Sequence, residues 1–179
     1  MSEFEYLAVF MSIIFGISTT HIMAGVIRSI YRGELNHTHF VLTAFFFLVL
    51  ILDWWTGFKW AEKESWNFIY FGVIVVWSMA HYIGAITLYP PSSAGVEHPF
   101  EYRHNWFLWA FIGVASMDIV QTATRGDLFT LPAYLPFVGH YILVSLVALY
   151  VNKPMFHRVM AWYLLLTTIS WSLIARLSL

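Results

Sequence analysis

The chain has no cysteine and few charged residues among its 179 residues. Without cysteine there are no disulfides, no thiolate metal sites and no cysteine nucleophile. Charged residues make up 11% of the chain, whereas soluble domains have about 25%. The net charge of −1 provides no basic surface for nucleic acid. These absences argue against a soluble domain and against a nucleic-acid-binding protein.

Apolar side chains are abundant instead, at 60% of all residues. A soluble fold of this length could not bury so much apolar surface, whereas a membrane-spanning helix needs about 20 apolar residues. The sequence therefore predicts an all-α integral membrane protein with one transmembrane domain over residues 1–179. Its six predicted spans cover residues 4–27, 40–60, 66–88, 106–124, 131–151 and 155–177, approximately.

The first residues indicate the location and the orientation of the chain. Glu3 and Glu5 are acidic where a signal peptide would be basic, so we expect the first apolar run to be retained as a span. Arg28 and Arg32 follow this run, and no lysine or arginine precedes it. By the positive-inside rule we expect the N-terminus outside. We expect a multi-pass protein of a cell membrane, in this case the bacterial inner membrane.

Two segments of the chain resemble each other. In residues 15–22 and 112–119, glycine aligns with glycine, isoleucine with isoleucine, and His21 with Asp118. Two halves of three spans each would be inverted relative to one another, as in many channels and transporters. The alternative is a chance alignment, because apolar helices use few residue types.

Five ionisable side chains lie within the predicted spans, where each is costly to bury. Helical rise places Asp53 and Asp118 about 10 Å from one membrane face. It places His21 and His81 about 9–10 Å from the other face, and His140 between the two layers.

This layering predicts a channel or transporter for protons, small ions or small polar solutes. Aspartate and histidine chains are the usual intramembrane proton relays. Asp118, Gln121, Thr122 and Arg125 share one helical face and could line a polar cavity. The alternative is that such groups only bond neighbouring hydroxyls or carbonyls and fix helix packing.

Two other functions remain open. His21 and His81, at similar depth, could hold a b-type haem in an electron-transfer or sensor protein, and the aromatic content of 20% could wall the porphyrin. The chain could also be a non-catalytic membrane subunit of a larger complex. The leading hypothesis involves no cofactor. No phosphate-binding glycine loop or Gly-x-Ser-x-Gly elbow supports an enzyme.

Two further segments have polar or small residues at regular spacing. Glu97, Glu101 and His104 lie in the longest polar loop, which we interpret as solvated rather than metal-binding. On the first span, small residues recur every fourth position and permit close helix approach, which we expect inside the bundle rather than between subunits. This ridge consists of Ser12, Gly16, Thr20 and Ala24. We nevertheless expect a homo-oligomer in the lipid bilayer.

The segments Phe4–Tyr6, Ser12–Ile17 and Asp53–Trp55 resemble small bacterial multi-span membrane proteins. The resemblance covers mainly the first two spans. No activity is attached to such sequences, so the resemblance implies a membrane location and no functional residue.

Overall fold

The computed structural model describes residues 3–34, 36–63, 65–90, 104–130, 133–151 and 153–177. These residues form α-helices joined by short connections, with one 3₁₀ helix, η1, directly after α2. The elements are α1 (Glu3–Arg32), α2 (His37–Thr56), η1 (Gly57–Glu62), α3 (Phe68–Leu88), α4 (His104–Arg125), α5 (Tyr134–Tyr150) and α6 (Pro154–Leu177).

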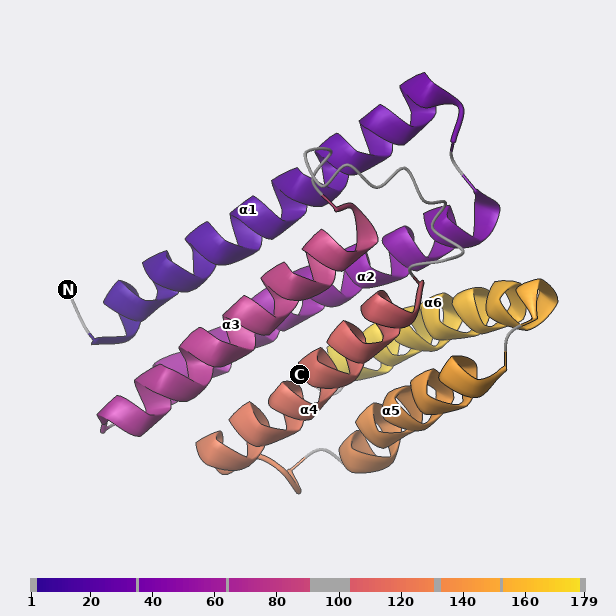
Figure 1. Cartoon of the computed structure of the whole chain (residues 1–179). Coiled ribbons are helices and arrows are strands. Elements are labelled where there is room, and N and C mark those ends of the chain that lie inside the picture. Colours follow the sequence, from indigo (N-terminus) through magenta and orange to yellow (C-terminus); the bar gives the residue numbers. More distant parts are fainter. Residues whose placement is uncertain are drawn as a thin grey trace.

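The helices lie in two layers (Figure 1). One layer has the order α1, α3, α4, α5, and the second layer consists of α2 and α6 packed against each other. Because α2 lies behind the first layer, α3 packs mainly on α1 and α4. The pair α2–α6 therefore faces the pair α4–α5 across the interior of the bundle.

Local signals in the sequence explain where several helices begin and end. The side chains of Asn36 and Asn67 accept hydrogen bonds from backbone N–H groups in the first turns of α2 and α3, at 2.8 and 2.9 Å. Gly33 and Gly126 follow α1 and α4 with positive φ angles of 66° and 101°, the left-handed conformation that glycine adopts most easily at helix ends.

Four of the helices are long and apolar enough to cross a membrane: α1, α2 together with η1, α3 and α4. Helix α5 has 17 residues and is apolar, but it extends only about 26 Å against a hydrocarbon core of about 30 Å. The all-α architecture with membrane-type helices is thus confirmed. Six full spans are not confirmed, because α5 is short and α6 is not among the four.

The arrangement does not confirm the inverted repeat. Helix α1 packs along α3, whereas α4, its predicted counterpart, packs along α3 and α5. An inverted repeat would place α6 beside α4 as α3 lies beside α1. The repeat therefore stays a prediction.

The ridge of small residues on α1 does not pack inside the bundle, although Ser12 Oγ accepts a hydrogen bond from Trp54 Nε1 of α2 at 3.3 Å. All four residues, Ser12, Gly16, Thr20 and Ala24, are exposed. Helix α1 buries a different stripe, which includes Leu7, Met11, Phe15, Ile22 and Gly25. The prediction of an internal contact is therefore wrong, because larger apolar side chains decide which face of α1 turns inward.

Tyr89, directly after α3, joins three helices. Its backbone oxygen lies 2.5 Å from His21 Nε2 on α1. Its ring lies 4.5 Å from the ring of His39 on α2, and its hydroxyl is 3.0 Å from Thr43 Oγ1. The ring also covers Gly25 of α1, where a Cβ atom would lie 2.2 Å from Tyr89 Cγ. Glycine at position 25 is thus required by the close approach of this ring.

We predict that Gly25→Ala destabilises the protein, because a methyl group would force the Tyr89 ring from its place. Overpacking of this kind costs about 1–3 kcal/mol. Thermal unfolding in detergent, followed by circular dichroism, should show a lower midpoint. The matched control is Gly16→Ala on the same helix, where an added Cβ meets no atom within 4 Å. That control should be neutral or more stable by up to about 1 kcal/mol. Equal midpoints for both variants would contradict the packing described.

Candidate functional site

A cavity of about 960 Å³ lies between the α2–α6 pair and the α4–α5 pair. Its wall is largely apolar and aromatic, with ionisable groups midway and at one end. The charged side chains on this wall are Asp53, Lys59, Asp118, Arg125 and Asp127. The aromatic ones are Trp55, Phe111, Tyr134, Phe137, Tyr141 and Trp171.

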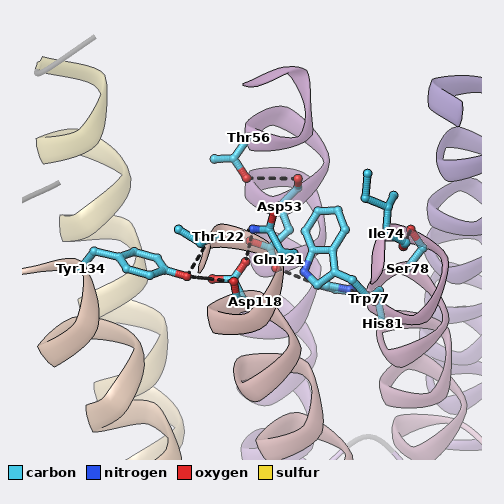
Figure 2. Close-up of polar contacts among 10 residues, drawn as sticks. All are labelled: Asp53, Thr56, Ile74, Trp77, Ser78, His81, Asp118, Gln121, Thr122 and Tyr134. Carbon is cyan, nitrogen blue, oxygen red and sulfur yellow. Dashed lines mark hydrogen bonds and ion pairs between the residues drawn. The ribbon is translucent and has the colours of Figure 1, made fainter. Parts of the chain in front are cut away.

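Asp53 and His81 form a hydrogen bond (Figure 2). His81 is fully buried on α3, and its Nε2 lies 2.7 Å from Asp53 Oδ2, while its Nδ1 lies 2.8 Å from the carbonyl oxygen of Trp77. A carbonyl only accepts, so Nδ1 carries the hydrogen of that bond. Between Nε2 and Oδ2 a second proton is then required, either on an imidazolium or on a protonated carboxyl. The pair is electrically neutral in both forms and becomes an anion when it loses this proton.

Asp118, on α4, is held by neutral donors instead (Figure 2). The Tyr134 hydroxyl lies 2.7 Å from Oδ2, and Gln121 Nε2 lies 3.0 Å from Oδ1. Both carboxyl oxygens thus act as acceptors, as in an ionised carboxylate. No positively charged group forms a hydrogen bond with Asp118 in the described part of the chain, so its hydrogen bonds come from neutral donors.

Gln121 has its orientation set by Trp60. The indole Nε1 of Trp60, which can only donate, lies 3.0 Å from Gln121 Oε1. The amide nitrogen of Gln121 must therefore point toward Asp118 and Thr122. Trp60 is fully buried, although its place near a predicted span end is typical of an interfacial residue. Helix η1 turns Trp60 inward, and the sequence gives no sign of this turn.

Charges of both signs lie at one end of the cavity. Arg125, at the end of α4, donates from Nε to Asp127 Oδ2 at 2.5 Å, and its guanidinium lies over the Trp60 ring. Lys59 of η1 lines the same end. Asp118 precedes Arg125 by seven residues, so the carboxylate lies about 10 Å deeper along α4.

The opposite end of the cavity is closed by packed aromatic rings. Phe111 and Tyr141 line the cavity, and both contact Phe45 at ring distances of 5.0 and 5.8 Å. Phe45 is fully buried. The Tyr141 hydroxyl also lies 2.5 Å from Thr168 Oγ1 and joins α5 to α6. Packed side chains therefore stand between the cavity and the other end of the bundle.

The structure brings together some of the predicted pathway residues. Asp53, Asp118 and Gln121 line the cavity, and so do Thr122 and Arg125 from the polar stripe predicted on α4.

The predicted depth of His81, in a layer with His21, is wrong, because His81 contacts Asp53. In a helix each Cα–Cβ bond leans toward the N-terminus. Since α2 and α3 run in opposite directions, the side chains of Asp53 and His81 lean toward each other.

His140 and His21 lie away from the cavity. His140 is surrounded by aromatic rings, with centroids 4.2 Å from Tyr141, 5.2 Å from Phe137 and 5.7 Å from Tyr163. It is not among the cavity residues, so the predicted relay through His140 has no support in the geometry. His21 bonds to Tyr89 near the other end of the bundle.

The predicted haem ligands do not face each other. Both ring nitrogens of His81 have partners, Trp77 and Asp53. His21 bonds to Tyr89, eight residues beyond His81 and about 12 Å further along the α3 direction. Two imidazoles on one metal ion have nitrogens about 4 Å apart, since each bond is about 2 Å. A haem therefore stays an untested prediction that this geometry does not favour.

Of the predicted polar loop, the structure describes Pro90, His104 and Asn105, whereas Glu97 and Glu101 lie outside the described residues. The His104 ring lies 4.3 Å from the ring of His157 at the start of α6. Within the described residues there is no group of three or more potential metal ligands.

Several site residues were missed from the sequence. The sequence places Tyr134 in the apolar span predicted over residues 131–151, although it lies between Pro132 and Pro136 at the start of a helix. Asp127 falls in the connection after the fourth predicted span, and Lys59 falls at the end of the second predicted span, so the sequence singles out neither of them. No sequence signal would have identified Thr168, because its role depends on the packing of α6 against α5.

Compared with protein-family models, curated proteins and solved structures, the chain matches none. The site is therefore interpreted from its own geometry, and the resemblance to small bacterial multi-span proteins stays untested.

We predict that Tyr134→Phe lowers the free energy of unfolding, because Asp118 loses the hydroxyl that donates to Oδ2. An unsatisfied buried acceptor costs about 1–3 kcal/mol. Thermal unfolding in detergent measures the change. The matched control is Tyr150→Phe at the other end of α5, where the side chain is 88% exposed. That variant should stay within about 0.5 kcal/mol of the wild type. Loss of stability in the control alone would contradict this assignment.

Proposed function

We propose that the protein is a proton-coupled membrane transporter whose small-molecule substrate binds in the cavity between α2, α4, α5 and α6. The observation that carries this proposal is the hydrogen bond between His81 and Asp53, because it holds a proton beside the cavity that Asp53 lines. A substrate in the cavity would change the electrostatic cost of holding this proton, which is the physical basis of coupling.

The burial of the two carboxylates supports a functional role. Ionisable side chains in membrane-spanning segments are costly and mark substrate or proton pathways. The side chain of Asp53 is 18% exposed, and Asp118 interacts electrostatically with it. Two acidic groups close enough to repel each other would be eliminated from a purely structural core, because apolar residues pack there at lower cost.

The aromatic rings that close one end of the cavity favour a transporter over an open channel. Phe45, Phe111 and Tyr141 close one end of the cavity. A solute that enters the cavity can leave on the other side only if these helices rearrange. Alternating access of this kind is the expected behaviour of a carrier.

Proton flux into proteoliposomes tests the proposal. An imposed pH gradient should drive proton entry, reported by a pH-sensitive dye inside the vesicles. Asp53→Asn and Asp118→Asn should reduce the rate to that of vesicles without protein, because an amide does not exchange a proton at these pH values.

The matched control for this experiment is Glu62→Gln. Glu62 is an exposed carboxylate at the end of η1 and is outside the cavity. Its variant should conduct protons at the wild-type rate. An unchanged rate of proton entry in both aspartate variants would contradict the proposed proton pathway.

A further inference from the structure

The size, wall and charges of the cavity indicate a class of substrate. This inference rests on the proposed function. Its volume of about 960 Å³ is at the upper end of the range for drug-sized ligands, about 300–1,000 Å³. It is far larger than a bare inorganic ion requires. Trp55 and Leu173 line it and are also 59% and 58% exposed on the outside of the bundle. The cavity thus reaches the outer surface of α2 and α6, where a lipophilic molecule could enter.

Aromatic rings form much of the cavity wall. The stacked pair Phe137 and Trp171 has ring centroids 4.1 Å apart, and Tyr134, Tyr141, Phe111 and Trp55 complete the set. The faces of aromatic rings carry partial negative charge and attract organic cations, most strongly where water is excluded. Such a wall therefore suits an apolar body that carries a positive charge.

The charges midway along the cavity point to the same class of ligand. Asp118 is bonded to no cation in the described residues, and the Asp53–His81 pair becomes an anion when its proton leaves. The cations on the wall lie at the end, where Arg125 is already paired with Asp127 and Lys59 is partly exposed. An anionic ligand in the centre of the cavity would face two carboxylates, whereas a cation would face two partners.

An inorganic cation fits this arrangement poorly. Hard metal ions need about six oxygen ligands in a small shell. Both oxygens of Asp118 already accept from Gln121 and Tyr134, and the described residues contain no group of three candidate metal ligands. A bulky organic cation requires only proximity to the carboxylates and contact with the rings.

We propose that the cavity binds a lipophilic organic cation, with its charge between Asp53 and Asp118 and its apolar groups against the aromatic wall. The cation replaces the proton shared by Asp53 and His81: the pair loses one positive charge as the proton leaves, and the ligand restores it. Binding therefore releases a proton.

The charged and titratable groups that face this site come from each surrounding element. They are Asp53 of α2, Lys59 of η1, His81 of α3, Asp118 and Arg125 of α4, Asp127 after α4, and Tyr134 and Tyr141 of α5. The cavity residues described on α6 are uncharged. Because the bound cation displaces a proton from the Asp53–His81 pair, binding weakens as the pH falls.

Calorimetric titration of the purified full-length protein in detergent tests the proposal. The probe is tetraphenylphosphonium, a permanent cation with four aromatic rings, and the control ligand is tetraphenylborate, which has the same shape and the opposite charge. The phosphonium should bind at least about tenfold more tightly than the borate, a difference of about 1.4 kcal/mol. Titrations in buffers of different ionisation enthalpy should show release of about one proton per bound cation.

Variants locate the binding site. Asp118→Asn and Asp53→Asn should weaken phosphonium binding roughly tenfold or more and leave borate binding unchanged or stronger. Glu62→Gln should bind as the wild type does. Equal affinity for the two ligands would overturn the proposal. So would an affinity for phosphonium that is unchanged in both aspartate variants. The comparison of the two ligands on the wild-type protein needs no variant, so a variant that fails to fold does not prevent the test.

Failure of this inference is distinguishable from failure of the proposed function. Binding is measured in detergent without a gradient, whereas proton flux is measured in vesicles without an organic cation. Selective phosphonium binding without aspartate-dependent proton flux would keep the cation-binding site and contradict the proposed proton pathway. Aspartate-dependent proton flux without phosphonium selectivity would keep the transporter and eliminate this substrate class.

Discussion

The contact between His81 and Asp53 constrains the rest of the site. Because His81 Nδ1 must donate to the Trp77 carbonyl, its other nitrogen can approach Asp53 to 2.7 Å only with a proton between them. A carboxylate and a fully buried imidazole would each be costly alone among apolar helices, but together they are neutral. The interaction joins α2 to α3, although α3 packs mainly on α1 and α4.

The second carboxylate is stabilised in a different way. Asp118 receives hydrogen bonds from Tyr134 and Gln121, and Gln121 is oriented by Trp60. Dipoles that are fixed by packing stabilise a charge without neutralising it. The two carboxylates thus differ: Asp53 is hydrogen-bonded to an imidazole that can carry a proton, whereas Asp118 is hydrogen-bonded to neutral donors. A binding site for a positive charge needs a carboxylate such as Asp118, which no cation neutralises. Coupling to protons needs a carboxylate such as Asp53, which contacts a group that can carry a proton.

The cavity exists because the helix pairs α2–α6 and α4–α5 do not pack tightly along their whole length. Near one end the pairs are joined by aromatic rings, with Phe45 in contact with Phe111 and Tyr141. Toward the other end the space remains open between them and reaches Lys59 and Arg125. Large rings that fill one end and small or polar side chains at the other give the bundle a closed and an open side.

The sequence by itself determined the class of the protein and part of the site. Long apolar runs with few charges can be stable only as lipid-exposed helices, and the spacing of Asp118, Gln121, Thr122 and Arg125 places them on one face of α4 at any packing. Burying a charge within a membrane costs free energy, so Asp53 and Asp118 within apolar runs could be recognised as candidate site residues. Tertiary structure alone decided that His81 meets Asp53, that His140 and His21 do not face the cavity, and that Trp60 and Tyr134 support Asp118. Those contacts depend on which helices pack together and on their tilt, and the periodicity of a single helix contains no information about its neighbours.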